Sequence, residues 1–451
     1  MPREAIVEIA AVGKGLLGAR LLQSTVEYPD ALDYIALDLG ALPKLDTCAN
    51  VGAYGSALQK ALAAHGAIAN ELKQISLTQA PDTALLQFLI AQPEGERLRW
   101  ETLCMAPPDQ FLALNGVCTV SRIAHTAAPT DPGIRTFTFP LRMAAFLSAA
   151  RIEAEGEFNE VCARVGDAKA KGLDIACTVY LGEQELLDAA LKAVEAKQLP
   201  GIQVAPIPAD RQEIENTLKE HPVEFLHFFC HGVTDAGVRL LELATVNDHD
   251  TERASGSIPF SIERLTQVLL ATGTTWITVL NSCSGGRPVE QLHSMALTLA
   301  KSASPFVVGM AEVVEIEDAT IVTRAFYSEL FDIVRARVGK LADGETVTLN
   351  LAPAVIRARR ALHSQYETAP SDAYGRWSIP LMYRRHVPLH VLRRSDLDPD
   401  TKRRIELVAG ALRSLPEDAP LELRQQILAT LDKAGVPAAR RPNVFGVLPT
   451  A

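Results

Sequence analysis

The pattern of hydrophobic and polar residues becomes regular at about residue 140. From there on, short apolar runs alternate with amphipathic segments of about 10–15 residues, the order expected of strands and their connecting helices. The predicted strands are Leu141–Ala149, Leu173–Leu181, Ile202–Ile207, Val223–Cys230, Trp276–Leu280, Pro305–Gly309 and Trp377–Tyr383. The predicted helices are Glu157–Lys171, Glu183–Lys197, Ala209–His221, Ser261–Ala271, Val289–Ser302, Asp318–Arg337 and Val347–Ser364. This alternation predicts an α/β fold, with a mainly parallel sheet and helices on both of its faces.

The residues before and after this region follow other patterns. The N-terminal part mixes predicted strands, at Ala5–Val12 and Ala84–Ala91, with a predicted helix at Val51–His65, and it ends in a Pro-rich linker. From Ser395 onward the chain is charged, and residues 401–435 predict two short amphipathic helices. The predicted parts are an N-terminal α+β region (1–139), a central α/β region (140–394) and a helical C-terminal extension (395–451). The extension is interpreted either as an adaptor or regulatory segment or as a packing extension of the central region.

Composition narrows the classes of function. With 451 residues, of which 48% are hydrophobic, the chain can bury two ordinary cores. The net charge of −10 is spread without a basic stripe, so we expect no nucleic-acid partner. Seven cysteines without C-x-x-C spacing suggest no disulfide framework and no zinc site, which fits a reducing cytosol. We expect a cytoplasmic protein with no cofactor, no metal and no membrane segment, since charged residues interrupt the apolar stretch near the N-terminus.

Two predicted strands are followed by residues that can carry chemistry. The run Val223–Cys230 ends at His231 and Gly232, and the run from Trp276 to Ser282 ends at Cys283. The carboxyl ends of parallel strands share one edge of a sheet, where ligands bind. If the two strands are neighbours, the imidazole of His231 can take the proton of the Cys283 thiol and leave a nucleophilic thiolate. The simpler alternative is that Cys283 is a buried core residue, as most cysteines are.

Small residues near this edge predict an oxyanion hole. The backbone N–H groups of Gly232 and Cys283 are candidates for the donors, because Gly232 permits a close approach and Cys283 precedes a predicted helix. Such donors supply the largest electrostatic contribution in many acyl transfers. The sequence offers no candidate for a third, orienting carboxylate, so a backbone carbonyl is expected to fix the imidazole. The prediction is therefore a His/Cys dyad.

These motifs resemble those of CHAT domains, which belong with the caspases and separases. The likeness rests on the His-Gly motif at 228–232 and the Asn-x-Cys-x-x-Gly motif that begins at Asn281. It extends through Gly309–Met310, an acidic stretch, Phe326–Tyr327 and the closing run Trp377–Tyr383, with weaker similarity at Tyr54–Leu58 and Arg99–Leu103. The resemblance covers about residues 50–390. It implies a caspase-like α/β sandwich, with His231 as general base and acid, Cys283 as nucleophile, and a pseudo-protease-like or scaffold region before them.

The resemblance also implies a class of substrate. Members of this family cleave proteins, often in bacterial defence or cell-death systems, after an upstream sensor activates them, so the expected partners are a protein substrate and an activating partner or a second copy. Several relatives prefer a basic residue before the cut, which requires a carboxylate in the S1 pocket. In some relatives an aspartate two residues before the nucleophile serves, but here that position is Asn281. The S1 candidates are Asp318, which is favoured, and Glu317, Glu315 and Glu312.

Two other classes of function remain open. A protein with this fold can be a non-catalytic scaffold that binds partners in the same crevice, or a cysteine hydrolase or acyltransferase that acts on a small molecule. The segments Thr245–Ser257 and Ser284–Glu290 flank the crevice and contain turn-forming residues. We expect both to be mobile until a partner, a ligand or self-association orders them.

Overall fold

A computed structural model describes most of the chain between residues 3 and 447. Outside the described residues lie 1–2, 41, 44, 46–50, 106–109, 125–132, 254, 284–291, 313, 368–373, 395–398, 417–418, 435, 437–440 and 448–451. At residues 282, 283, 292, 293, 399 and 402 only the backbone is described. Much of the linker expected before residue 139 therefore falls outside the described part.

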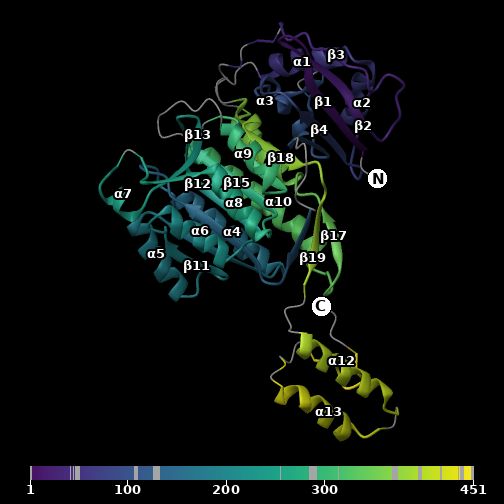
Figure 1. Cartoon of the computed structure of the whole chain (residues 1–451), viewed down its shortest axis with the longest axis vertical. Coiled ribbons are helices and arrows are strands. Elements are labelled where there is room, and N and C mark those ends of the chain that lie inside the picture. The colour runs from purple at the N-terminus through teal and green to yellow at the C-terminus, as the bar shows by residue number, and fades with distance from the viewer. Residues whose placement is uncertain are drawn as a thin grey trace.

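One large sheet forms the centre of the protein (Figure 1). Its strands in the central region have the order β11-β10-β9-β12-β15-β16-β18, and they are parallel as far as β16, which pairs with β18 in the antiparallel sense. Their bounds are β9 (Leu141–Leu147), β10 (Ile175–Leu181), β11 (Ile202–Pro206), β12 (Phe225–Asp235), β15 (Ile277–Cys283), β16 (Phe306–Met310) and β18 (Pro380–Arg385). The predicted α/β class with a mainly parallel central sheet is confirmed.

The N-terminal region continues this sheet. Strand β18 pairs with β7, and the order then runs β7-β4-β1-β2-β3. These strands are β1 (Arg3–Gly13), β2 (Leu16–Ser24), β3 (Ile35–Ala36), β4 (Ala84–Ile90) and β7 (Cys118–Ala124). The two regions thus share one sheet and meet at the β7–β18 seam.

The helices cover the two faces of the sheet in the way that strand alternation requires. In β12, Phe225 and Phe229 join the core on one face, whereas Phe228 and Cys230 join the core on the other. On the first face lie α1 (Val51–Ala63), α2 (Gly66–Ser76), α4 (Glu155–Ala170), α5 (Gln184–Glu195), α10 (Ile316–Val338) and α11 (Ala354–Tyr366). On the second lie α6 (Arg211–Glu220), α8 (Ile262–Thr272) and α9 (Leu292–Ser302).

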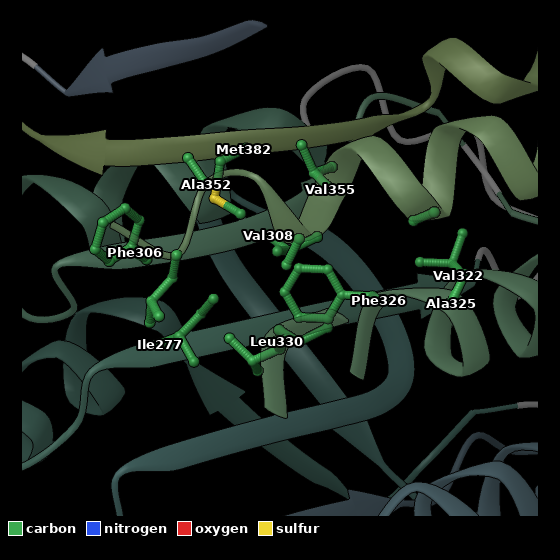
Figure 2. Close-up of a cluster of buried hydrophobic side chains, with 14 of the residues drawn as sticks. Ile277, Phe306, Val308, Val322, Ala325, Phe326, Leu330, Ala352, Val355 and Met382 are labelled. Atoms are coloured by element: carbon green, nitrogen blue, oxygen red, sulfur yellow. The ribbon is translucent and has the colours of Figure 1, made fainter. Parts of the chain in front are cut away.

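The first face has a dense core at α10. Figure 2 shows Phe326 and Leu330 of this helix beside Ile277 and Val308 of the strands, with Val355 of α11 completing the layer. These side chains are buried, so each contributes about 1.5–3 kcal/mol through removal from water. The packing holds α10 against β15 and β16, and the first turns of the same helix reach Asn281 near the carboxyl end of β15.

The structure corrects the predicted elements at two places. The helix predicted from Val347 is wrong at its start, because Thr346–Leu349 forms strand β17 and α11 begins only at Ala354. The β-branched alternation of Thr-Val-Thr-Leu favours a strand. Strand β12 does not end at His231 either. It runs on to Asp235 and turns through Ala236 and Gly237, whose φ values of 46° and 82° suit a two-residue hairpin.

The remaining elements complete the body and the extension. Beyond the β12 turn, the hairpin continues as β13 (Val238–Leu243) and β14 (Ile258–Ser261), and a small sheet joins β17, β19 (Leu389–Arg393) and β8 (Ile134–Phe137). Short elements are α3 (Pro93–Glu96), η2 (Trp100–Thr102), β5 (Cys104–Met105), β6 (Gln110–Phe111), η3 (Leu112–Leu114), α7 (Val246–Asp250) and η4 (Arg376–Ser378).

The C-terminal extension forms the two helices that the sequence predicts. They are α12 (Pro399–Ser414) and α13 (Leu421–Lys433), which pack on each other and stand apart from the sheet in Figure 1. Their small core contains Ile405, Leu431 and Val436. Across the described residues, no helix has an apolar stretch long enough to cross a membrane.

Candidate active site

His231 and Cys283 lie opposite each other on neighbouring strands. Strand β12 pairs in parallel with β15, and the register matches His231 with Cys283 and Phe229 with Asn281. The prediction that the two strands are neighbours is therefore confirmed. Pairing of β12 with β9 has already ended at Phe229, so His231 lies at the carboxyl edge of the parallel part of the sheet.

A backbone carbonyl orients the His231 ring. The side chain is 1% exposed, and its Nε2 lies 2.8 Å from the carbonyl oxygen of Ala150, in the loop that follows β9. A carbonyl only accepts hydrogen bonds, so Nε2 carries the ring hydrogen and Nδ1 carries the lone pair. Nδ1 is then the ring nitrogen able to accept a proton. The sequence analysis expects a backbone carbonyl, in place of a carboxylate, to fix the imidazole, and the Ala150 carbonyl lies in that position.

The predicted oxyanion donors are placed only in part. Gly232 is buried and lies in the β12–β13 ladder opposite Leu241. Cys283 is the last residue of β15, and only its backbone is described. The helix that follows is described from Leu292, and the residues expected to carry its N-terminus beside Cys283 lie outside the described part.

The four S1 candidates lie just before α10 or in its first turn, and two of them already have cationic partners. Asp318 is buried, accepts a hydrogen bond from the Tyr366 hydroxyl, and pairs with Arg376 at 3.2 Å. Glu312 forms an ion pair with Arg99. Glu315 and Glu317 are exposed. The structure therefore gathers the candidates near the site without leaving a buried, unpaired carboxylate among them.

The segment Thr245–Ser257 is more organised than the sequence predicts. It contains the short helix α7, whose Thr245 and Asp248 form a reciprocal cap. The Asp248 carboxylate also accepts hydrogen bonds from the N–H and hydroxyl of Ser257. Burial alone would raise the pKa of Asp248, but these hydrogen bonds outweigh it and lower the pKa to about 2. The segment thus has local structure, while its mobility before activation stays a prediction, and the other flanking segment, 284–290, lies outside the described residues.

Sequence reasoning missed a buried polar group beneath the dyad. We call it the floor cluster: Glu157, His227, Asn281, Thr323 and Tyr327, each at most 1% exposed. The Nδ2 of Asn281 donates to Glu157 Oε1 at 2.8 Å and to the carbonyl oxygen of Ala319 at 3.2 Å. Strand alternation in the sequence could have placed part of the cluster on this face, because positions 227, 229 and 231 pair with 279, 281 and 283. Nothing in the sequence placed Glu157 there, because α4 reaches this face only through tertiary packing.

No arrangement of three or more His, Cys, Asp or Glu side chains suited to a metal ion occurs among the described residues. The residues with reactive side chains at this edge are His231, with an imidazole, and Cys283, with a thiol, and their backbones pair in register.

Comparison with known proteins identifies the family. The model of the CHAT domain matches residues 55–383. The chain belongs to the CHAT domain family. This membership supports a caspase-like cysteine protease in general terms, and the match includes both the His231 and the Cys283 strands.

Solved structures with similar folds include a cysteine proteinase. The Arg-specific cysteine proteinase gingipain R (RgpB) is 8% identical, with a TM-score of 0.37, over 70% of this chain and 67% of the gingipain chain. A complex of the pro- and mature domains of RgpB from Porphyromonas gingivalis gives 8% identity and a TM-score of 0.36, over 70% and 69% of the two chains. No curated protein matches this CHAT-domain chain in sequence.

Proposed function

We propose that this CHAT protein is a regulated cysteine endopeptidase in which His231 and Cys283 form a catalytic dyad. The observation that carries the proposal is their register: the two residues face each other at the carboxyl end of adjacent parallel strands. The Ala150 carbonyl supports it, because it holds the imidazole in the tautomer whose Nδ1 can take a proton.

The proposed reaction has two acyl-transfer steps. Nδ1 of His231 takes the proton of the Cys283 thiol, and the thiolate attacks the peptide carbonyl carbon to form a C–S bond. The C–N bond breaks as the imidazolium gives its proton to the leaving amine. Water then attacks the thioester with His231 as base, which releases the carboxylic acid and restores the thiol. Backbone N–H groups of Gly232 and Cys283 are the proposed donors to the oxyanion.

The biological setting of the proposal rests on the CHAT family. We infer that the substrate is a partner protein in a bacterial defence or cell-death system, and that an activating partner or self-association switches the enzyme on. Mixing the protein with the products of neighbouring genes should yield one discrete cleavage that Cys283→Ala abolishes. Full turnover of a peptide by the purified protein alone would contradict the switch and leave the dyad intact.

The dyad is tested by covalent labelling. In the presence of the products of the neighbouring genes, as activators, an acyloxymethyl ketone peptide should add one mass equivalent to the protein, and Cys283→Ala and His231→Ala should both abolish the adduct. Cys230→Ala is the matched control, because Cys230 is adjacent to the same edge but faces the opposite core. It should keep the adduct. Labelling that survives Cys283→Ala would exclude the protease, and partner binding without any labelling would favour the scaffold.

A further inference from the structure

Within the described residues, the Glu157 carboxylate of the floor cluster has no arginine or lysine partner, and its ion pair with His227 depends on protonation of that ring. Glu157 Oε1 accepts from Asn281 Nδ2 at 2.8 Å and from the Thr323 hydroxyl at 2.5 Å. No donor within the described residues reaches Glu157 Oε2 or the side-chain oxygen Oδ1 of Asn281. Two buried acceptors therefore point into the same group of side chains with no hydrogen to accept, which is costly unless a ligand supplies it.

His227 lies beside Glu157 but makes no hydrogen bond to it. Burial, together with the Glu157 charge, raises the pKa of Tyr327 well above its usual value, so its hydroxyl keeps its proton. That hydroxyl lies 2.9 Å from His227 Nδ1, so one nitrogen of the ring is engaged by Tyr327. The other, Nε2, lies 2.9 Å from Glu157 Oε1 but is not aligned for a hydrogen bond. Among the described residues, Glu157 Oε2 therefore has no hydrogen-bond donor, from His227 or from any other side chain.

The two acceptors lie near the carboxyl end of β15, the strand that ends at the proposed nucleophile. Asn281 is two residues before Cys283, roughly 7 Å along the strand, and its amide lies on the face covered by α4 and α10. The β15–β16 ladder spans only Ile277–Val279, although β15 continues to Cys283. At Asn281, β15 therefore has no ladder partner on the side of β16.

Other buried polar atoms without partners do not share these properties. The amide of Gln87 is also buried and unpaired among the described residues, but it is neutral and lies on β4 in the N-terminal region. The acidic residues near the start of α10 are either paired with Arg376 or Arg99 or exposed. Glu157 alone combines a buried charge, a free oxygen among the described residues and a position under the dyad.

We propose that Glu157 is the carboxylate that selects the residue before the scissile bond, and that this residue is arginine or lysine. The proposal rests on the proposed protease function and deepens it. Asn281 holds Glu157 in place through its amide, and its own oxygen offers a second acceptor. A guanidinium or ammonium group at the end of a long stem fits such a pair of acceptors, since each presents several donors. Glu157 then does the work that the sequence assigned to Asp318.

The test compares arginine with citrulline, which has the same length and no charge. Acyloxymethyl ketone probes carry either residue at the position before the warhead and randomised residues upstream, and the rate of Cys283 adduct formation is measured by intact mass. The wild-type protein should favour arginine by about 30-fold or more, as expected for a buried charge pair. Glu157→Gln should reduce this ratio to a few-fold while both probes still label. Asp318→Asn, the matched control, should keep the wild-type ratio.

The outcomes separate the two proposals. A wild-type ratio near one, an unchanged ratio in Glu157→Gln, or a ratio lost in Asp318→Asn overturns the role of Glu157 and leaves the dyad standing. No adduct with either probe in any folded protein when the products of the neighbouring genes are present as activators, or an adduct that survives Cys283→Ala, overturns the protease itself. Circular dichroism of each variant shows whether it folds, and Asn281→Ala serves as a second variant: loss of the Glu157 hydrogen bond should also lower the ratio.

Discussion

Two clusters of buried polar side chains lie on the same sheet, and they differ in how their positive and negative charges are balanced. The first, which we call the seam cluster, joins the two regions where β7 meets β18 and contains Arg122, Arg359, Glu96, Glu101 and Tyr383. The second is the floor cluster beneath the dyad. Two arginines face two glutamates in the seam cluster, whereas the floor cluster has one glutamate and no arginine or lysine.

The seam cluster uses its donors fully. Arg122 donates two hydrogen bonds to the Glu101 carboxylate, of 3.0 and 2.8 Å. It donates three more, to the carbonyl oxygen and the carboxylate of Glu96 and to the carbonyl oxygen of Leu98. Burial alone would raise the pKa of Glu101, but the charges of Arg122 and Arg359 outweigh it and lower the pKa. Burial lowers the pKa of Arg359 to about 10, so both arginines stay charged at neutral pH.

The difference indicates different roles. A buried ion group whose glutamates are paired with arginines contributes to a fixed structure, even though Glu96 Oε1 has no donor among the described residues, and losing one member leaves a charge without a partner. A buried carboxylate without an arginine or lysine partner costs free energy in the free protein and recovers it when such a cation binds. We infer that the seam cluster holds the two regions together and that the floor cluster is built for a ligand.

The largest expected effect is at the seam. Arg122→Met should lower the free energy of unfolding by about 3–5 kcal/mol, because it leaves Glu101 and Glu96 buried without their cation. Chemical denaturation at pH 7 measures the change. The control is Arg324→Met, which removes an exposed arginine from Glu160 on the surface and should cost about 1 kcal/mol or less. If the two variants lose equal amounts of unfolding free energy, the seam cluster does not have the proposed structural role.

A carboxylate that accepts mostly from neutral donors, together with the partly exposed Arg253, gives an intermediate effect. Asp248 has a pKa of about 2, so its stabilisation is complete above roughly pH 4 and disappears as the pH falls through 2. Asp248→Asn should destabilise the α7 segment by about 2 kcal/mol at pH 7. Hydrogen exchange of the amides in this segment measures it, with the exposed Asp250→Asn as control. A difference between wild type and Asp248→Asn that persists undiminished at pH 2 would contradict the assignment.

Sequence patterns predicted the elements that depend on local periodicity. The alternation of strands and helices after residue 140 gave the parallel sheet, and the two runs ending at His231 and Cys283 gave the edge where they meet. Buried parallel strands are continuous apolar runs, so their ends are visible in a single sequence. The helices of the extension followed from the same reasoning.

The partners of each charge could not be predicted in this way. Asp318 was favoured for S1 among the acidic residues after the nucleophile, on the strength of the resemblance to CHAT domains, yet Tyr366 and Arg376 reach it from distant segments. Glu157 appeared to be an ordinary first-turn glutamate of α4, where acidic residues are common. Which carboxylate is paired depends on contacts between elements more than a hundred residues apart, such as Asn281 with Glu157.

The smallest expected effect is the one that separates the two clusters most sharply. Glu157→Gln should change the free energy of unfolding by no more than about 1 kcal/mol, since a glutamine oxygen still accepts from Asn281 and Thr323 while a buried, unbalanced charge is removed. The same substitution at the seam, Glu101→Gln, should cost several times more, because it leaves Arg122 with a neutral partner. Parallel urea titrations of the two variants make the comparison. If Glu157→Gln proves as destabilising as Glu101→Gln, the floor cluster is structural, because a site kept ready for a ligand gains nothing from its charge until the ligand arrives.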